Sequence, residues 1–267
     1  MATTLSSTEH QIIAELLGTD LGVDVFERMQ GSGHNLLGFS NLGVDWVARW
    51  PKIQRPEPQW WQELSVQQIA AQYGIAPHAV ACSPQTQSLL LPRAQVSNSG
   101  LDQAAQLIKR CHQLPKLSQP LDIQHAFHYW WNLCPPEHQP WQQASQRTKM
   151  RRAAQHFATC KTPLVQSHGD PVAANMLQLQ GQPILIDWEY HCLAPLWWDL
   201  AIYAESQRLD DRSQHQLLQH YEPSLISDFA GHQLKVFMGI YADLAILWHC
   251  ATMRSSNYYQ TRQAHHV

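Results

Sequence analysis

Three side chains about two-thirds of the way along the chain have the types and spacing that phosphoryl transfer needs. Asp170 and Asn175 lie five residues apart in a predicted loop, and Asp187 follows twelve residues later. Phosphoryl transfer requires a carboxylate that receives the hydroxyl proton and oxygen ligands that hold Mg²⁺ on the nucleotide phosphates. Asp170 could supply the carboxylate, and Asn175 and Asp187 could supply the metal ligands. The alternative is an ordinary loop, since Asp and Asn are common loop residues.

The residues between Asn175 and Asp187 could bring these two side chains together. Residues 176–179 alternate in polarity like a strand, residues 180–183 (Gln-Gly-Gln-Pro) indicate a turn, and residues 184–186 are apolar. A tight hairpin over this segment returns Asp187 to the side of Asn175. Because Mg²⁺ keeps several waters, two protein ligands and the phosphates are sufficient to hold it.

The wider pattern resembles the aminoglycoside phosphotransferase and choline kinase family, which shares the protein-kinase-like fold. It comprises His168-Gly169-Asp170, Asn175, Ile186-Asp187-Trp188-Glu189 and then Asp199-Leu200-Ala201. The resemblance implies the same roles for Asp170, Asn175 and Asp187, and it implies that His168 and Asp199 support the catalytic loop. Residues 185–190 look most like those of bacterial thiamine kinases and choline kinases.

The N-terminal third predicts an antiparallel sheet with tight turns, from strands at residues 23–29, 36–42 and 46–50. In the turn Gly31-Ser32-Gly33, backbone N–H groups could approach nucleotide phosphates, although Gly-x-Gly is also common in ordinary hairpins. The resemblance implies that Arg49, near the end of the third strand, holds the phosphates.

Glu63 lies on a predicted helix at residues 59–73, where the kinase fold places a glutamate against the strand cation. We expect Glu63 to pair with Arg49. The alternatives are a solvent-facing arginine and a solvated helix glutamate.

We expect an α+β, two-lobed, protein-kinase-like fold. Residues 1–94 would form the N-lobe, a nucleotide-covering antiparallel sheet plus a helix, and residues 95–267 a mainly helical C-lobe with the catalytic loop and the substrate site. Two further strands are expected at residues 79–82 and 88–91. The remaining predicted helices are at residues 6–18, 101–114, 122–133, 140–160, 196–209, 214–221 and 228–253.

Composition limits the class of protein. The chain has 267 residues, of which 44% are hydrophobic, so a sizeable core is expected. A net charge of −3 without a long basic run argues against a nucleic-acid partner. We expect no membrane partner, because no apolar run approaches the roughly 18 residues that a membrane helix needs. The polar residues 1–9 and the scattered cysteines predict a cytoplasmic protein with reduced thiols.

The substrate side is rich in aromatic residues, whose faces attract cations. Trp188 and Glu189 directly follow the predicted metal ligand, so they are the first candidates for contact with a cationic alcohol. Aromatic residues on helices are more often part of the core than of a ligand cage. The other candidates are Tyr129, Trp130, Trp131, Trp197, Trp198, Tyr241 and Trp248.

Taken together, these features predict an enzyme that transfers the γ-phosphate of ATP, with Mg²⁺, to a primary alcohol. Thiamine is the expected acceptor, because chain length, Arg49 and residues 185–190 resemble bacterial thiamine kinases. Choline, ethanolamine and aminoglycosides are the alternative acceptors. A non-catalytic nucleotide-binding pseudokinase module, or a hydrolase that uses Asp170 as nucleophile, are the alternatives of another class. The oligomeric state is left open.

Overall fold

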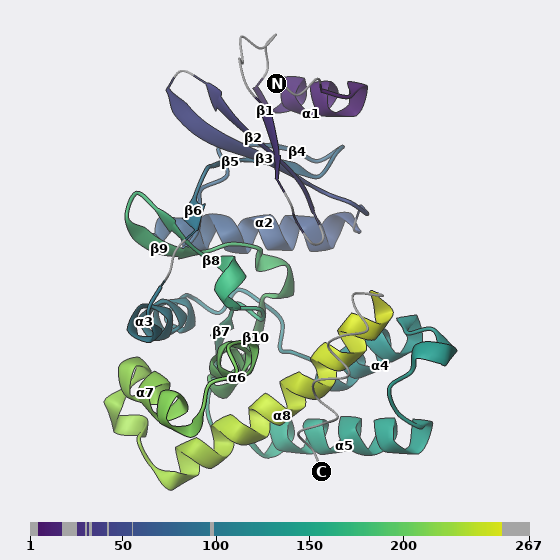
Figure 1. Ribbon diagram of the computed structural model, residues 1–267, viewed down its shortest axis with the longest axis vertical. Helices are drawn as coiled ribbons and strands as arrows, with labels where there is room; N and C mark the ends of the chain where they lie inside the picture. The colour runs from purple at the N-terminus through teal and green to yellow at the C-terminus, as the bar shows by residue number, and fades with distance from the viewer. Residues whose placement is uncertain are drawn as a thin grey trace.

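The computed structural model describes residues 5–17, 26–29, 31, 34–41, 43–54, 56–96 and 99–252. Its N-terminal part is a five-stranded antiparallel sheet, and its C-terminal part is mainly helical, as predicted (Figure 1). The strand order in the sheet is β1-β2-β3-β5-β4. The strands are β1 (Phe26–Met29), β2 (His34–Asn41), β3 (Val44–Pro51), β4 (Ala81–Ser83) and β5 (Ser88–Pro92).

Two helices cover the two faces of this sheet, α1 (Ser7–Leu17) and α2 (Glu57–Gln72). Successive side chains of a strand point to opposite faces. Leu90 of β5 packs in the cluster with α1, whereas its neighbours Leu89 and Leu91 pack in the cluster with Trp60 of α2. In β3, Ala48 belongs to the α1 side, so the alternation directs Arg49 toward α2.

The chain leaves the first sheet between β5 and β6 (Gln95–Val96). The boundary between the lobes after residue 94 stays a prediction. β6 pairs with β8 (Met176–Leu179), and β8 pairs with β9 (Gln182–Leu185) in the predicted hairpin. A second small sheet joins β7 (Leu164–Ser167) to β10 (Cys192–Pro195). β7 leads into the loop that carries Asp170, and β9 leads to Asp187.

The C-terminal part is built around one large apolar cluster to which most of its helices contribute. α6 is buried along almost its whole length, and α3, α7 and α8 pack around it (Figure 1). The predicted helices are present, with ends shifted by a few residues. They are α3 (Leu101–His112), α4 (Ile123–Leu133), α5 (Gln143–Thr159), α6 (Trp197–Ser206), α7 (Asp211–Tyr221) and α8 (Asp228–Ala251); short 3₁₀ turns lie at Pro136–His138, Ala173–Asn175, Trp188–Tyr190 and Pro223–Leu225.

Helix α8 corrects one prediction, because by length and composition alone it is apolar enough to cross a membrane. In the structure it packs against α4, α5 and α6, and its side chains Leu234, Phe237 and Leu247 are fully buried. Within the apolar window of α8, 39% is buried, and a single helix of this kind is weak evidence of a membrane span. The cytoplasmic location stays a prediction.

Candidate active site

The loop that carries Asp170 is anchored on a buried carboxylate. Asp199, in the first turn of α6, is 0% exposed. Its two oxygens accept hydrogen bonds from the backbone N–H groups of His168 (2.8 Å) and Gly169 (3.0 Å), the two residues before Asp170. The His168 ring is also buried and lies 3.0 Å, Nε2 to O, from the carbonyl oxygen of Ile186. The structure thus joins both predicted support residues to the loop.

Gly169 is the one position in this loop where a side chain cannot be accommodated. Its φ is +83°, a left-handed conformation that L-residues rarely adopt. A Cβ there would also collide with the carbonyl oxygen of Tyr190. The backbone of residues 188–190 therefore closes directly onto the loop before Asp170.

The hairpin brings the predicted metal ligands to the same place as Asp170. Asn175 Nδ2 donates to the carbonyl oxygen and to Oδ2 of Asp170, both at 2.9 Å. The N–H of Ile186 donates to the carbonyl oxygen of Asn175 at 3.0 Å, which sets Asp187 beside it. Because Nδ2 of Asn175 is used by Asp170, its Oδ1 is the atom that could bind a metal.

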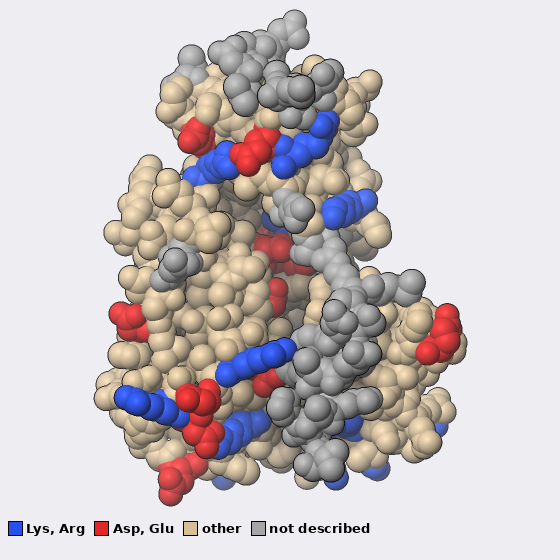
Figure 2. Space-filling model, in the orientation of Figure 1, with Lys and Arg blue, Asp and Glu red and all other residues tan. Residues whose placement is uncertain are grey.

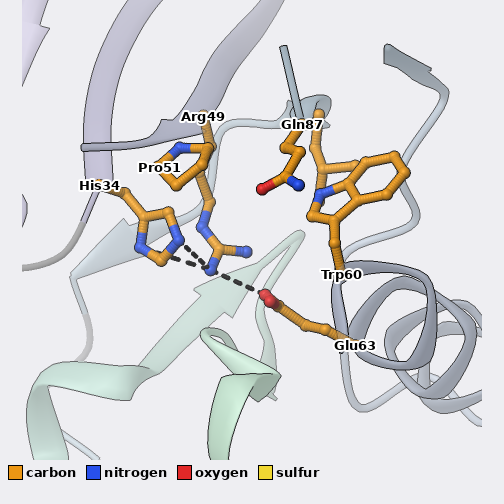
Figure 3. A pocket seen from close by; sticks show the side chains of 7 residues that line it. His34, Arg49, Pro51, Trp60, Glu63 and Gln87 are labelled. Carbon is orange, nitrogen blue, oxygen red and sulfur yellow. Dashed lines mark hydrogen bonds and ion pairs between the residues drawn. The ribbon is translucent and has the colours of Figure 1, made fainter. Parts of the chain in front are cut away.

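A charged cluster joins the sheet to Asp187 across 138 residues of sequence. Nη2 of Arg49 lies 2.7 Å from Asp187 Oδ1. The same nitrogen lies 2.8 Å from Glu63 Oε1 (Figure 3). The Arg49–Glu63 pair is therefore present as expected. His34 of β2, which the sequence analysis missed, lies with Nε2 2.9 Å from the same Arg49 nitrogen. An isolated histidine two residues after Ser32 carries no motif that could have identified it.

Asp170 and Arg49 respond differently to burial and to the charges around them. Burial raises the pKa of Asp170 to about 7, and the negative charges of Asp187 and Glu189 add to this, while the hydrogen bond from Asn175 opposes it. Burial would lower the pKa of Arg49, but Glu63 and Asp187 outweigh it and raise that pKa. Asp170 is thus poised to exchange a proton near neutral pH, and Arg49 remains a permanent cation.

The oxygen atoms in this region fit a hard divalent cation. One metal-ligating atom from each of Asp187, Glu189 and His34 lies within 4.8 Å of the others. Mg²⁺ prefers oxygen to nitrogen ligands. The donors that suit it here are therefore Asp187, Glu189 and Oδ1 of Asn175. Figure 2 shows acidic side chains inside a hollow between the sheet and the helical part.

The glycine turn is only partly described. The carbonyl oxygen of Gly31 accepts a hydrogen bond from Lys52 Nζ at 2.9 Å. A Cβ on Gly31 would lie 2.6 Å from the carbonyl oxygen of His34, so the turn leaves no room for a side chain there. Gly33 lies outside the described residues. Phosphate binding by this turn stays a prediction.

Trp188 is not on a surface that a substrate could reach, contrary to expectation. Its side chain is 0% exposed, packs in the core of the helical part and donates from Nε1 to the carbonyl oxygen of Leu185 at 3.1 Å. Its ring also packs edge-on against the His168 ring. Asp187 adopts a left-handed backbone conformation, and the 3₁₀ turn that follows it directs Trp188 inward. Trp131, Trp197 and Trp198 are also buried.

An aromatic surface beside the loop is formed by other residues, of which Tyr190 is exposed and Trp130 and Trp248 are half-buried. Tyr190 is 38% exposed and follows the half-buried Glu189. Its hydroxyl oxygen accepts a hydrogen bond from Trp248 Nε1 of α8 at 3.3 Å. The ring of Trp130 of α4 meets the Trp248 ring edge-on, with centroids 6.4 Å apart. We call Tyr190, Trp248 and Trp130 the aromatic rim.

Comparisons with known proteins agree with this geometry. Residues 36–235 match the model of the phosphotransferase enzyme family (APH). A search of curated protein sequences found no match. The structure is similar to the choline kinase LicA from Streptococcus pneumoniae, with 16% identity, a TM-score of 0.77 and coverage of 97% of this chain and 98% of that one.

Two further solved structures share the fold. A choline/ethanolamine kinase family protein from Mesorhizobium loti is 16% identical, with a TM-score of 0.70 and coverage of 90% of this chain and 86% of that one. The aminoglycoside phosphotransferase APH(2'')-Ib is 12% identical, with a TM-score of 0.66 and coverage of 94% of each chain. These likenesses confirm the predicted kinase-like fold. Because the family model spans most of the sequence, the chain belongs to the phosphotransferase enzyme family, which confirms the prediction of a phosphotransferase with an alcohol acceptor.

Proposed function

We propose that this protein transfers the γ-phosphate of ATP, in the presence of Mg²⁺, to the primary hydroxyl group of a small organic cation, with thiamine as the acceptor. The observation that carries the proposal is the convergence of Asp170, Asn175 and Asp187. Asn175 donates to Asp170, and the hairpin sets Asp187 beside Asn175. Similar proteins bind nucleotides, since a structure of LicA contains AMP.

Each side chain has a role that follows from its position. Asp170, with its pKa near neutrality, accepts the proton of the attacking hydroxyl group. Asn175 orients the Asp170 carboxylate through Nδ2. Asp187 and Oδ1 of Asn175 would hold Mg²⁺, which when bound would supply positive charge to the phosphates. Arg49, which pairs with both Glu63 and Asp187, would supply a second positive charge to the phosphates.

The remaining support residues keep the base in position. Asp199 holds the backbone N–H groups of His168 and Gly169, and the His168 ring packs between the loop and Trp188. A pseudokinase module would not need a carboxylate at the position of Asp170 with a pKa of about 7 and a fixed backbone. The catalytic alternative is therefore favoured. The hydrolase alternative would use Asp170 as a nucleophile and leave a phospho-aspartate.

The aromatic rim and the nearby carboxylates support a cationic acceptor. Tyr190 and Trp248 present aromatic faces beside Glu189 and Asp170, and such a combination attracts an organic cation. Choline and ethanolamine kinases are among the similar structures, which supports small cationic alcohols as a class. Residues 185–190 favour thiamine within that class; choline, ethanolamine and an aminoglycoside are the alternatives.

A panel assay tests the proposal. ADP release would be measured with ATP and Mg²⁺ and with thiamine, choline, ethanolamine, an aminoglycoside or a neutral sugar as the acceptor. We expect the highest kcat/KM with thiamine. Asp170→Asn should lower kcat about 10³-fold, within the usual range for general-base catalysis, without loss of ATP binding.

The outcomes separate the alternatives. Turnover with choline alone would support the proposed mechanism and would identify choline, in place of thiamine, as the acceptor. A phosphorylated Asp170 detected by mass spectrometry would support the hydrolase. ATP binding without turnover for any acceptor would contradict the proposal and favour the pseudokinase module.

A further inference from the structure

A buried polar chain runs from α7 to the loop that carries Asp170. The hydroxyl oxygen of Tyr221, in the last turn of α7, lies 2.8 Å from Nδ1 of His112. Nε2 of His112, the last residue of α3, lies 3.1 Å from Oδ2 of Asp199. All three side chains are buried. Asp199 in turn accepts the backbone N–H groups of His168 and Gly169.

The chemistry of these groups fixes the direction of the hydrogen bond to Asp199. Burial would raise the pKa of Asp199, but the hydrogen bond and charge of His112, together with His168, outweigh it and lower that pKa. An ionised carboxylate can only accept hydrogen bonds, so Nε2 of His112 carries the proton that it donates. On the other side of the ring, Nδ1 accepts from the Tyr221 hydroxyl when His112 is neutral and donates to its oxygen when His112 is charged. In both states Tyr221 holds the His112 ring in place against Asp199.

We infer that His112 and Tyr221 are positioning residues for the phosphoryl transfer. They act through Asp199, whose two oxygens set the position of the backbone immediately before Asp170. The inference rests on the proposed function in assigning the catalytic base to Asp170. Neither His112 nor Tyr221 reaches the cleft, since both are buried among α3, α6 and α7.

The chain offers a matched control for Tyr221. Tyr203 of α6 is buried to the same degree, 5% against 7% exposed, and its hydroxyl makes no hydrogen bond within the described part of the chain. Replacement of either tyrosine by phenylalanine removes one hydroxyl group from a buried side chain. Only Tyr221→Phe removes a hydrogen-bond partner of His112.

The test combines amide hydrogen exchange with kinetics on the full-length chain. Exchange of peptides that cover residues 164–176 would be measured without substrate in Tyr221→Phe, Tyr203→Phe, His112→Gln and His112→Leu. We expect Tyr221→Phe to speed exchange of this segment roughly fivefold, in proportion to one lost hydrogen bond, and Tyr203→Phe to leave it unchanged. His112→Gln keeps an N–H near the Nε2 position and should fall between the wild type and His112→Leu.

The kinetic arm separates positioning from general loss of stability. In the phosphotransferase assay, Tyr221→Phe should lower kcat several-fold while KM for ATP stays constant. Equal effects of Tyr221→Phe and Tyr203→Phe, or wild-type exchange of the loop in a folded His112→Leu protein, would overturn the inference. If the wild type shows no turnover with any acceptor, the exchange arm still decides whether His112 and Tyr221 hold the loop, so the failure of the proposed function is seen separately.

Discussion

The two sides of the cleft hold their functional groups by different means. On the N-lobe side, one Arg49 nitrogen is shared by Glu63, Asp187 and His34 through contacts between side chains. On the C-lobe side, the backbone before Asp170 is bound by a fully buried Asp199. Side-chain ion pairs can exchange partners, whereas backbone hydrogen bonds to a buried group cannot move without leaving polar atoms unsatisfied. We therefore expect an adaptable N-lobe side and a rigid C-lobe side.

Among the substitutions that test this difference, Asp199→Asn is expected to have the largest effect on stability and activity. The amide group would place an N–H donor against at least one of the backbone N–H groups of His168 and Gly169. We expect a loss of about 3 kcal/mol in the free energy of unfolding, as for a broken buried ionic contact, and a fall in kcat of about a hundredfold. Chemical denaturation and steady-state kinetics would measure the two effects.

Asp211→Asn is the matched control for that substitution. Asp211 pairs with Lys235 at the surface, where both side chains are more than half exposed. Its replacement should change the free energy of unfolding by less than about 0.5 kcal/mol. If Asp199→Asn behaves like Asp211→Asn, the C-lobe loop does not depend on the buried carboxylate.

The pH dependence of activity should report the ionisation of Asp170 on the C-lobe side. Asp170 must be ionised to accept a proton, and its pKa is raised to about 7. We expect kcat/KM, which reports the free enzyme, to fall about tenfold per pH unit below that value and to level off above it. A pH profile of kcat/KM would measure this. A profile that is flat from pH 5 to 8 would contradict the assignment of Asp170 as the base.

The same shift has an opposite effect on stability. Because the folded-state pKa of Asp170 lies above its ordinary value of 3.8, folding favours the protonated form. The stability linked to this proton is fully present below about pH 4 and is lost as the pH rises toward 7. Asp170→Asn should therefore raise the melting temperature more at pH 8 than at pH 4.

The N-lobe side should tolerate a conservative change that the C-lobe side does not. Arg49→Lys keeps a positive charge near Glu63 and Asp187 but loses the planar donor group of arginine. We expect KM for ATP to rise several-fold and kcat to change little. Arg28→Lys, at the ion pair with Glu9, is the control and should leave both constants unchanged. A loss as large as that from Asp199→Asn would show that the Arg49 cluster is as rigid as the loop.

Local sequence patterns predicted most of the helices and strands, and the resemblance to the family predicted the two-lobed fold. The hairpin between Asn175 and Asp187 is local, so the pattern of residues 176–186 was sufficient to predict it. The roles of Asp170, Asn175 and Asp187 stay predictions. β6, β7 and β10 are two to four residues long and exist because of distant partners, which no local periodicity records.

The orientation of side chains was harder to predict than their location. The spacing identified the segment 187–190 but assigned the substrate surface to Trp188, whereas the turn buries Trp188 and exposes Tyr190. His34 and His112 were missed because each is a single histidine whose role comes from partners on other elements.

The smallest effect is expected at the aromatic rim. A change there should affect binding of the acceptor and leave binding of ATP unchanged. Trp248→Leu removes an aromatic face and the donor to Tyr190, and a cation–π contact at a partly exposed site is worth about 0.5–1 kcal/mol. KM for the cationic alcohol should therefore rise about two- to fivefold while KM for ATP stays constant, and Trp248→Phe should have a smaller effect. Trp61→Leu, at an exposed position of α2, is the control. Because the rim would act through charge, an equal rise in KM for a neutral alcohol would show that Trp248 shapes the cleft without recognising a cation.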